Sequence, residues 1–180
     1  MQDEVTVYGK RFRVSLPAEK IQARVAEVAN QINNDLAGKD VVFLGILNGS
    51  FMFAADLMKS VNLPCKISFV KFSSYVGQKS TGNVKELIGL NEDIKGKSIV
   101  IIEDIVDTGS TMFDLLAYLK KFEPAEIRIA TLMYKPEVCR KDLNINYYGF
   151  TIPNDFIIGY GLDFDGLGRN LKDIYTIVNE

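Results

Sequence analysis

The hydrophobic and polar positions of this chain alternate between two periods. Between Pro17 and Ala37, apolar residues recur every three or four positions, which is the spacing of one face of a helix. These residues are Ile21, Val25, Val28, Ile32 and Leu36. Pro17 in the first turn and Gly38 just past the last are typical signals for the start and end of a helix. The continuous apolar run at 41–47 has the length of a strand, and a second helical pattern follows at 51–61.

The rest of the chain continues this alternation. Strand patterns occupy 65–72, the first half of 98–119, 125–133, 147–152, 156–162 and 174–178, with a short one expected at 86–90. Apolar strands that alternate with helices predict an α/β fold with a mostly parallel central sheet flanked by helices. The residues before Pro17 and after Phe150 lie outside this alternation, and we expect them to form a small hood lobe beside the sheet. The polar stretch 73–85 is expected to be a mobile loop.

Composition narrows the class of protein. The chain has 180 residues, 47% of them hydrophobic, which suits a single globular domain spanning 1–180. A net charge of −2 and a pI of about 5.3 provide no global basic field, so we expect neither nucleic acid nor a membrane as partner. No secretion signal or membrane-length apolar run is visible, and the two cysteines lack a CxxC spacing. These features predict a cytoplasmic location.

The chain contains no histidine. This absence excludes Ser-His-Asp and Cys-His catalysis and every metal site that needs an imidazole ligand. A general base must therefore be Asp, Glu, Lys, Tyr or Cys. Binding of a hard cation through oxygen ligands remains open.

The richest candidate chemistry lies in "SIVIIEDIVDTGSTMFDLLAYL", which reads as a buried strand, a polar turn and a helix. The turn offers the N–H groups of a helix start, which suit a phosphate, while Glu103 and Asp104 follow the apolar part of the strand. Taken singly, a cap at Asp107 or Thr108 and two solvated acids would explain these residues as well. Together they fit a ligand with a phosphate, vicinal hydroxyls and a bound divalent cation.

Ligands of such sheets gather beyond the carboxyl ends of the strands. Four segments should therefore share one rim: Leu47–Ser50, Phe72–Gly82, Glu103–Thr111 and Met133–Lys135. Two other glycine patterns carry no site. "GKS" at 96–98 leads into a strand, whereas a P-loop leads into a helix, and the glycines at 159–168 fit no GxGxxG register.

"VIIEDIVDTGSTM" resembles the phosphoribosyl-pyrophosphate (PRPP) signature of type I phosphoribosyltransferases. "SSYVGQKSTG", "LMYK" and "IPNDFIIGYGLDFDGLGRNL" resemble the hypoxanthine (hypoxanthine-guanine) phosphoribosyltransferase branch, so that the resemblance runs from about Val41 to the C-terminus. It implies a glycosyltransferase of purine salvage. Ribose 5-phosphate would pass from PRPP to N9 of a 6-oxopurine with Mg²⁺ present, giving IMP or GMP and pyrophosphate. It also implies a homodimer or homotetramer.

The resemblance assigns a role to each matching residue. Asp107 would be the general base for purine N7, and Ser74 and Tyr75 would belong to a loop that closes over the reacting centre. The PRPP site would comprise Glu103 and Asp104 at the ribose hydroxyls, Asp107 near the reacting carbon of the sugar, and Thr108, Gly109, Ser110 and Thr111 around the 5′-phosphate. Pyrophosphate would contact Asn48, Gly49 and Arg169, and the purine would contact Lys135, Phe156, Ile157 and Asp163. Glu103, Asp104 and Asp163 would lie at the metal.

One position departs from the family pattern. Many members carry Lys in the turn after the first core strand, where this chain reads "LNGS". Asn48 cannot supply a cation to pyrophosphate, although its amide can still donate hydrogen bonds. Three alternatives stay open: a transferase that prefers xanthine or another nucleobase, a PRPP-binding regulator, and an unrelated α/β nucleotide or redox protein.

Overall fold

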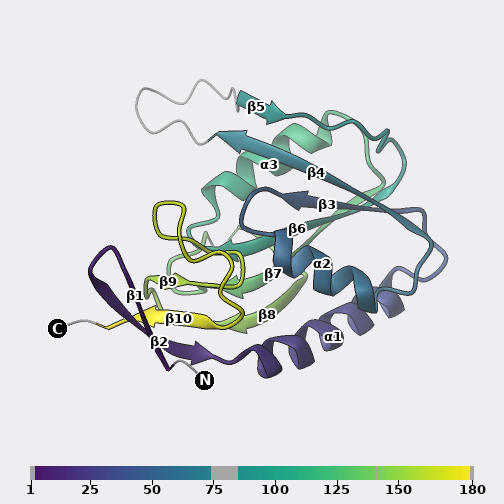
Figure 1. Cartoon of the computed structure of the whole chain (residues 1–180). Helices are drawn as coiled ribbons and strands as arrows, with labels where there is room; N and C mark the ends of the chain where they lie inside the picture. The colour runs from purple at the N-terminus through teal and green to yellow at the C-terminus, as the bar shows by residue number, and fades with distance from the viewer. Residues whose placement is uncertain (1–2, 74–84, 141, 179–180) are drawn as a thin grey trace.

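A six-stranded central sheet organises the chain, seen here in a computed structural model that describes residues 3–73, 85–140 and 142–178 (Figure 1). The strand order is β5-β4-β3-β6-β7-β8. Five strands run parallel: β3 (Val41–Ile46), β4 (Cys65–Ser73), β6 (Ser98–Val106), β7 (Glu126–Tyr134) and β8 (Tyr147–Thr151). Strand β5 (Lys85–Ile88) pairs antiparallel with β4 at one edge. The predicted α/β class and mostly parallel sheet are confirmed.

Helices cover both faces of this sheet. Helices α1 (Ala18–Asp35) and α2 (Phe51–Ser60) share one apolar core with it, and α3 (Ser110–Lys120) packs into a second core on the opposite face. The apolar stripe expected on α1 is buried in the first core. The helix begins directly after Pro17, and Gly38 follows its end, as the sequence predicted.

The two ends of the chain form a separate antiparallel sheet, the hood, which lies beside the central sheet (Figure 1). Its strands are ordered β1 (Glu4–Val7), β2 (Lys10–Leu16), β10 (Ile174–Ile177) and β9 (Ile157–Ile158). The expected hood lobe is therefore confirmed. Its first hairpin was not predicted as strands, although apolar alternation on both sides of "YGK" signals a hairpin.

The prediction of one strand over 156–162 is wrong. Only Ile157 and Ile158 form strand β9, and the backbone then enters the left-handed region at three consecutive residues, Gly159, Tyr160 and Gly161. Such dihedrals are incompatible with an extended strand. Ile157, Tyr160 and Leu162 of this stretch are buried for another reason, since they pack into the first core of the central sheet.

Two buried polar contacts attach the hood to the helices of the central sheet. The Asp173 carboxylate, which is only 4% exposed, accepts a hydrogen bond of 2.7 Å from the Ala18 backbone N–H at the start of α1. The Tyr160 hydroxyl donates to the Asp56 carboxylate on α2 at 2.6 Å. Burial and this bond raise the pKa of Tyr160 well above its ordinary value, so the phenol stays a donor at neutral pH.

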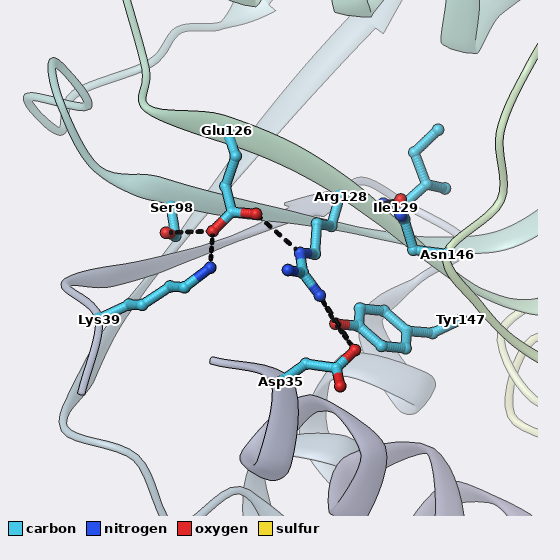
Figure 2. Close-up of polar contacts among 8 residues, drawn as sticks. All are labelled: Asp35, Lys39, Ser98, Glu126, Arg128, Ile129, Asn146 and Tyr147. Carbon is cyan, nitrogen blue, oxygen red and sulfur yellow. Dashed lines mark hydrogen bonds and ion pairs between the residues drawn. The ribbon is translucent and has the colours of Figure 1, made fainter. Parts of the chain in front are cut away.

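A polar network lies at the amino ends of the parallel strands β6 and β7 (Figure 2). The Glu126 carboxylate accepts hydrogen bonds from Lys39, from the Ser98 hydroxyl at 2.8 Å and from Arg128 at 2.9 Å. Arg128 also pairs with the Asp35 carboxylate at 3.0 Å. The Lys39 bond, followed by those from Ser98 and Arg128, lowers the pKa of Glu126 from 4.5 to about 2. This network links α1, β6 and β7 far from the carboxyl ends of the strands.

We expect the Glu126→Gln substitution to lower the free energy of unfolding at pH 7 by about 1–2 kcal/mol, because it removes the charge that accepts three hydrogen bonds. The loss is no larger because the network is partly exposed and is screened by solvent. Since the folded-state pKa lies below the unfolded value, this stabilisation is present above pH 4.5 and is lost as pH falls toward 2. Urea unfolding between pH 3 and pH 7 measures both effects. Glu123→Gln, in a solvent-exposed pair with Lys95, is the matched control and should change stability by less than about 0.5 kcal/mol. Equal losses in the two variants would contradict the assignment.

None of the helices in the described part of the chain is both long enough and apolar enough to span a membrane. Cys65 and Cys139 are free thiols.

Candidate active site

Three of the four segments predicted to share a rim do so. Beyond β3, the Leu47 backbone N–H donates to Val70 on β4 at 2.9 Å, and beyond β7 the Lys135 N–H donates to Val106 on β6 at 3.1 Å. The parallel pairing of these strands brings their carboxyl ends together at one edge. Most of the fourth segment, including Ser74 and Tyr75, lies outside the described residues.

The turn before α3 forms a small hollow of about 120 Å³. It is lined by Glu103, Ile105, Val106 and the run from Asp107 to Met112, so every residue predicted for the 5′-phosphate is present. The helix does not begin with the cap at Asp107 or Thr108 that a purely structural explanation would require. Its N-cap is Gly109, which has no side chain, and the Ser110 N–H makes a long hydrogen bond of 3.4 Å to Thr108 Oγ1. An anion at this helix start can therefore bind the N–H groups of the first turn, with only this long bond to compete.

Gly109 is required by its surroundings as well as by its backbone. Its φ is +78°, in the left-handed region, and a Cβ there would lie 2.7 Å from the Leu143 side chain and 3.2 Å from Cys139 Sγ. The segment after β7 thus packs directly against the phosphate turn. The Arg140 backbone N–H also donates to the Thr108 carbonyl at 3.1 Å, which fixes the shape of the hollow.

Glu103 and Asp104 differ from the expected end of a strand, because β6 continues to Val106. The pairing of β6 with β3 stops at Ile102, which frees the next two residues from one neighbour. The Asp104 charge lies close enough to act on the Glu103 carboxyl group. Burial, together with the Asp104 charge, raises the pKa of Glu103 well above its ordinary value, and burial raises the pKa of Asp104. Two crowded acids in this state favour a ligand that brings hydroxyl donors or a cation.

The Leu47–Ser50 turn closes one side of this acid pair. Its first peptide bond, Leu47–Asn48, is cis. A Cβ at Gly49 would overlap the Asp104 carboxylate, and a Cβ at Gly161 of the hood would overlap the Gly49 carbonyl. Asp104, the turn and the segment at Gly161 are consequently in direct contact, and a side chain at 49 or 161 would have to displace a neighbour.

Lys135 connects the phosphate turn to the far side of the site. Only 7% of this residue is exposed, so it is not the solvated strand end that a simpler interpretation would allow. Its Nζ lies 3.3 Å from the Asp107 carboxylate and 3.1 Å from the Asn154 side-chain oxygen. The two residues predicted to handle the purine ring and its proton are therefore joined by an ion pair.

Phe156 is 45% exposed, so its ring is accessible to a ligand. Its ring contacts Phe164 edge-on with the centroids 5.4 Å apart, which holds it at the surface. Ile157 is buried beside it in β9, paired with Thr176 of β10. The arrangement can offer an aromatic face to a planar ligand.

Asp163 and Arg169 form an ion pair with a separation of 2.6 Å. The Gly166 N–H also donates to Asp163 at 2.7 Å, and Arg169 donates to the Gly161 carbonyl at 2.7 Å. Arg169 is therefore paired with Asp163 rather than with Asp165 or Asp173, the other acids nearby in the sequence. Through Gly161 it reaches the Leu47–Ser50 turn, on the side predicted for pyrophosphate.

The predicted metal set is only partly assembled. Glu103 and Asp104 are adjacent and supply the hard oxygen donors that Mg²⁺ prefers, and their mutual repulsion would be relieved by a cation. Asp163 is committed to Arg169 and Gly166. Among the described residues there is no cluster of three Asp, Glu or Cys side chains placed to hold a metal. The acid pair therefore fits a cation that is held largely by the oxygens of a ligand.

Comparison with known proteins decides the family. The model of the phosphoribosyl transferase domain matches residues 16–165. The hypoxanthine-guanine phosphoribosyltransferase of Mycobacterium bovis is 40% identical over 171 residues, which cover 91% of this chain and 85% of that protein. This chain belongs to the hypoxanthine phosphoribosyltransferase family.

Two further relatives support the same family. The hypoxanthine phosphoribosyltransferase of Salmonella typhimurium is 39% identical and is covered to 94% of its length. A crystal structure of a hypoxanthine-guanine phosphoribosyltransferase from Bacillus anthracis, with HEPES in the active site, superposes with a TM-score of 0.87 at 38% identity. That superposition covers 92% of this chain and 98% of the other.

Two residues of this phosphoribosyltransferase site were missed in the sequence. Asn154 accepts a hydrogen bond from Lys135, and Lys71 on β4 reaches Asn48. Asn154 lies in the matched motif "IPNDF", two residues before Phe156, and its place in that motif is the signal that could have identified it. The alternating pattern of "CKISFVKF" predicts only a solvated lysine at position 71, because its partner, Asn48, lies on a different segment.

Proposed function

We propose that this phosphoribosyltransferase transfers ribose 5-phosphate from PRPP to N9 of a 6-oxopurine. The bases would be hypoxanthine and guanine, the products IMP or GMP and pyrophosphate, and the role purine salvage. The observation that carries the proposal is the contact between Lys135 and Asp107, 3.3 Å apart. It joins a cation suited to a purine oxygen at position 6 to the acid beside the sugar-phosphate turn, so one ligand can bridge both.

The chain's own residues account for each part of the reaction. The amides and hydroxyls from Thr108 to Thr111 hold the 5′-phosphate. Glu103 and Asp104 accept hydrogen bonds from the ribose hydroxyls and stabilise the positive charge that develops on the sugar as pyrophosphate leaves. Asp107 removes the proton from purine N7 while N9 bonds to the sugar carbon.

The purine ring is held from two sides. Phe156 stacks on the face of the purine, which the exposure of the phenylalanine ring supports. The Ile157 backbone forms hydrogen bonds with the edge of the purine. Lys135 donates to the oxygen at position 6, and a 6-amino base would leave this ammonium facing another donor. Asp163 lies near position 2 of the purine.

We also propose Mg²⁺ as cofactor, held by Glu103 and Asp104 with Asp163 nearby. When bound, it neutralises charge on the departing pyrophosphate. The crowded acid pair, with its raised pKa values, supports this assignment.

The direct test is a spectrophotometric assay with PRPP, Mg²⁺ and each of hypoxanthine, guanine, xanthine and adenine. We expect turnover with hypoxanthine and guanine, none with adenine, and loss of turnover when EDTA removes the metal. Turnover with xanthine alone, or with no 6-oxopurine, would overturn the proposal.

The Lys135→Ala substitution should weaken purine binding more than PRPP binding. Removing the ammonium deletes a charge-assisted hydrogen bond to the base, so we expect the KM for hypoxanthine to rise by tenfold or more. The KM for PRPP should change by less than about threefold. Initial-rate kinetics with each substrate varied separate the two effects, and equal changes in both KM values would contradict the assigned role.

Three further points complete the proposal and rest on the sequence and family alone. The whole chain, 1–180, acts as one phosphoribosyltransferase domain, of which the family match covers 16–165. It forms a homodimer or homotetramer. It is cytoplasmic, with no nucleic-acid or membrane partner.

A further inference from the structure

The pyrophosphate side of the site needs positive charge. If the proposed function holds, on which this inference rests, the leaving group carries several negative charges past Glu103 and Asp104. The Leu47–Ser50 turn, which faces this region through Gly49 and Asp104, contains no cationic residue. Arg169 reaches the turn from the hood, but its charge is already paired with Asp163 at 2.6 Å.

Lys71 brings a second cation to the same turn from the neighbouring strand. Parallel pairing aligns Ile46 of β3 with Val70 of β4, so Lys71 stands level with the first residue of the turn. Its Nζ lies 3.3 Å from the Asn48 side-chain oxygen. Asn48 is exposed and Lys71 is half-buried, so both side chains lie at the open edge of the site.

Lys71 contacts a neutral amide. Among the residues whose side chains the structure describes, 3–72, 89–140 and 142–178, no carboxylate lies within ion-pair distance of its Nζ. By contrast, Lys66 on the same strand is neutralised by Glu92 at 2.9 Å. An ammonium has three donors, and the Asn48 oxygen can take only one of them, which leaves the charge and two donors for an anion.

We infer that Lys71, oriented by Asn48, is the cation that binds the pyrophosphate group of PRPP at this turn. Asn48 acts as a positioning residue, because its side-chain oxygen fixes the ammonium beside the turn. Lys71 and Arg169 then flank the Leu47–Ser50 turn from its two sides, one at Asn48 and the other through Gly161. The charge that the turn itself lacks is supplied by the adjacent strand.

The test is Lys71→Met, which keeps the length of the side chain and removes its charge. We expect the KM for PRPP in the forward reaction, and for pyrophosphate in the reverse reaction, to rise about 10- to 100-fold. The KM values for hypoxanthine and IMP should stay within about threefold, and Lys71→Arg should retain most of the affinity. Lys66→Met, on the same strand but paired with Glu92, is the matched control and should behave as the wild type.

A relocation of the charge provides the sharper test. Asn48→Lys in the Lys71→Met background puts an ammonium on the turn itself and should recover at least tenfold of the lost PRPP affinity. Wild-type KM values for PRPP and pyrophosphate in Lys71→Met would overturn the inference. If the wild type turned over no 6-oxopurine, the proposed function would fail. Calorimetric titration of wild type and Lys71→Met with magnesium pyrophosphate would still decide the role of Lys71, because equal affinities would refute it.

Discussion

The Asp107→Asn enzyme should fold normally and lose the phosphoribosyl transfer rate by a factor of about 10²–10⁴. The amide is isosteric with the carboxylate but cannot accept the N7 proton. Folding should persist because half of the Asp107 side chain is exposed and its ion pair is with one residue, Lys135. The kcat from single-turnover measurements with saturating PRPP and hypoxanthine reports this loss.

A second substitution separates chemistry from a general effect of removing charge. Asp40→Asn makes the same change on an exposed carboxylate paired with Lys97, outside the site, and should leave kcat unaltered. Calorimetry should find PRPP bound to Asp107→Asn with an affinity close to that of the wild type. A kcat reduced only a few-fold would remove Asp107 from the role of general base.

The Gly49→Ala substitution should reduce kcat/KM for PRPP by about 10²-fold or more. The backbone of Gly49 is not in the left-handed region, so alanine meets no conformational penalty there. Its Cβ would instead overlap the Asp104 carboxylate, which has to move away from the ribose hydroxyls. Steady-state kinetics with PRPP as the varied substrate measures the effect.

A double-mutant cycle tests this explanation. If the added methyl group acts by displacing Asp104, then Gly49→Ala should cause little further loss in an Asp104→Ala background. Losses that multiply would show that the two positions act independently. Thermal unfolding of each variant separates a displaced carboxylate from a destabilised fold.

Most of the fold could be predicted because its determinants are local. The helical spacing over Pro17–Ala37 and the continuous apolar runs of β3 and β6 each matched an observed element. The error at 156–162 came from treating apolar letters as a strand, although two glycines there permit left-handed backbone. The pairing of the hood strands could not be predicted, since β2 pairs with β10 across almost the whole chain.

The same distinction applies to the site, where residues contiguous in sequence could be predicted and contacts between segments could not. The phosphate turn is contiguous in sequence, so its residues could be recognised together, and they line one hollow. The contact of Gly49 with Asp104, the bond from Lys135 to Asn154 and the reach of Lys71 to Asn48 join different segments. Such contacts depend on strand order and register, which no single-sequence pattern specifies.

The central claim is that the Asp107–Thr111 turn holds the sugar phosphate of PRPP while Glu103 and Asp104 bind its ribose hydroxyls. A crystal structure of the protein with PRPP and Mg²⁺ tests it most directly. The account predicts the 5′-phosphate within hydrogen-bond distance of the amides at the start of α3, with the ribose hydroxyls on the acid pair. PRPP bound elsewhere, with this turn empty, would contradict it.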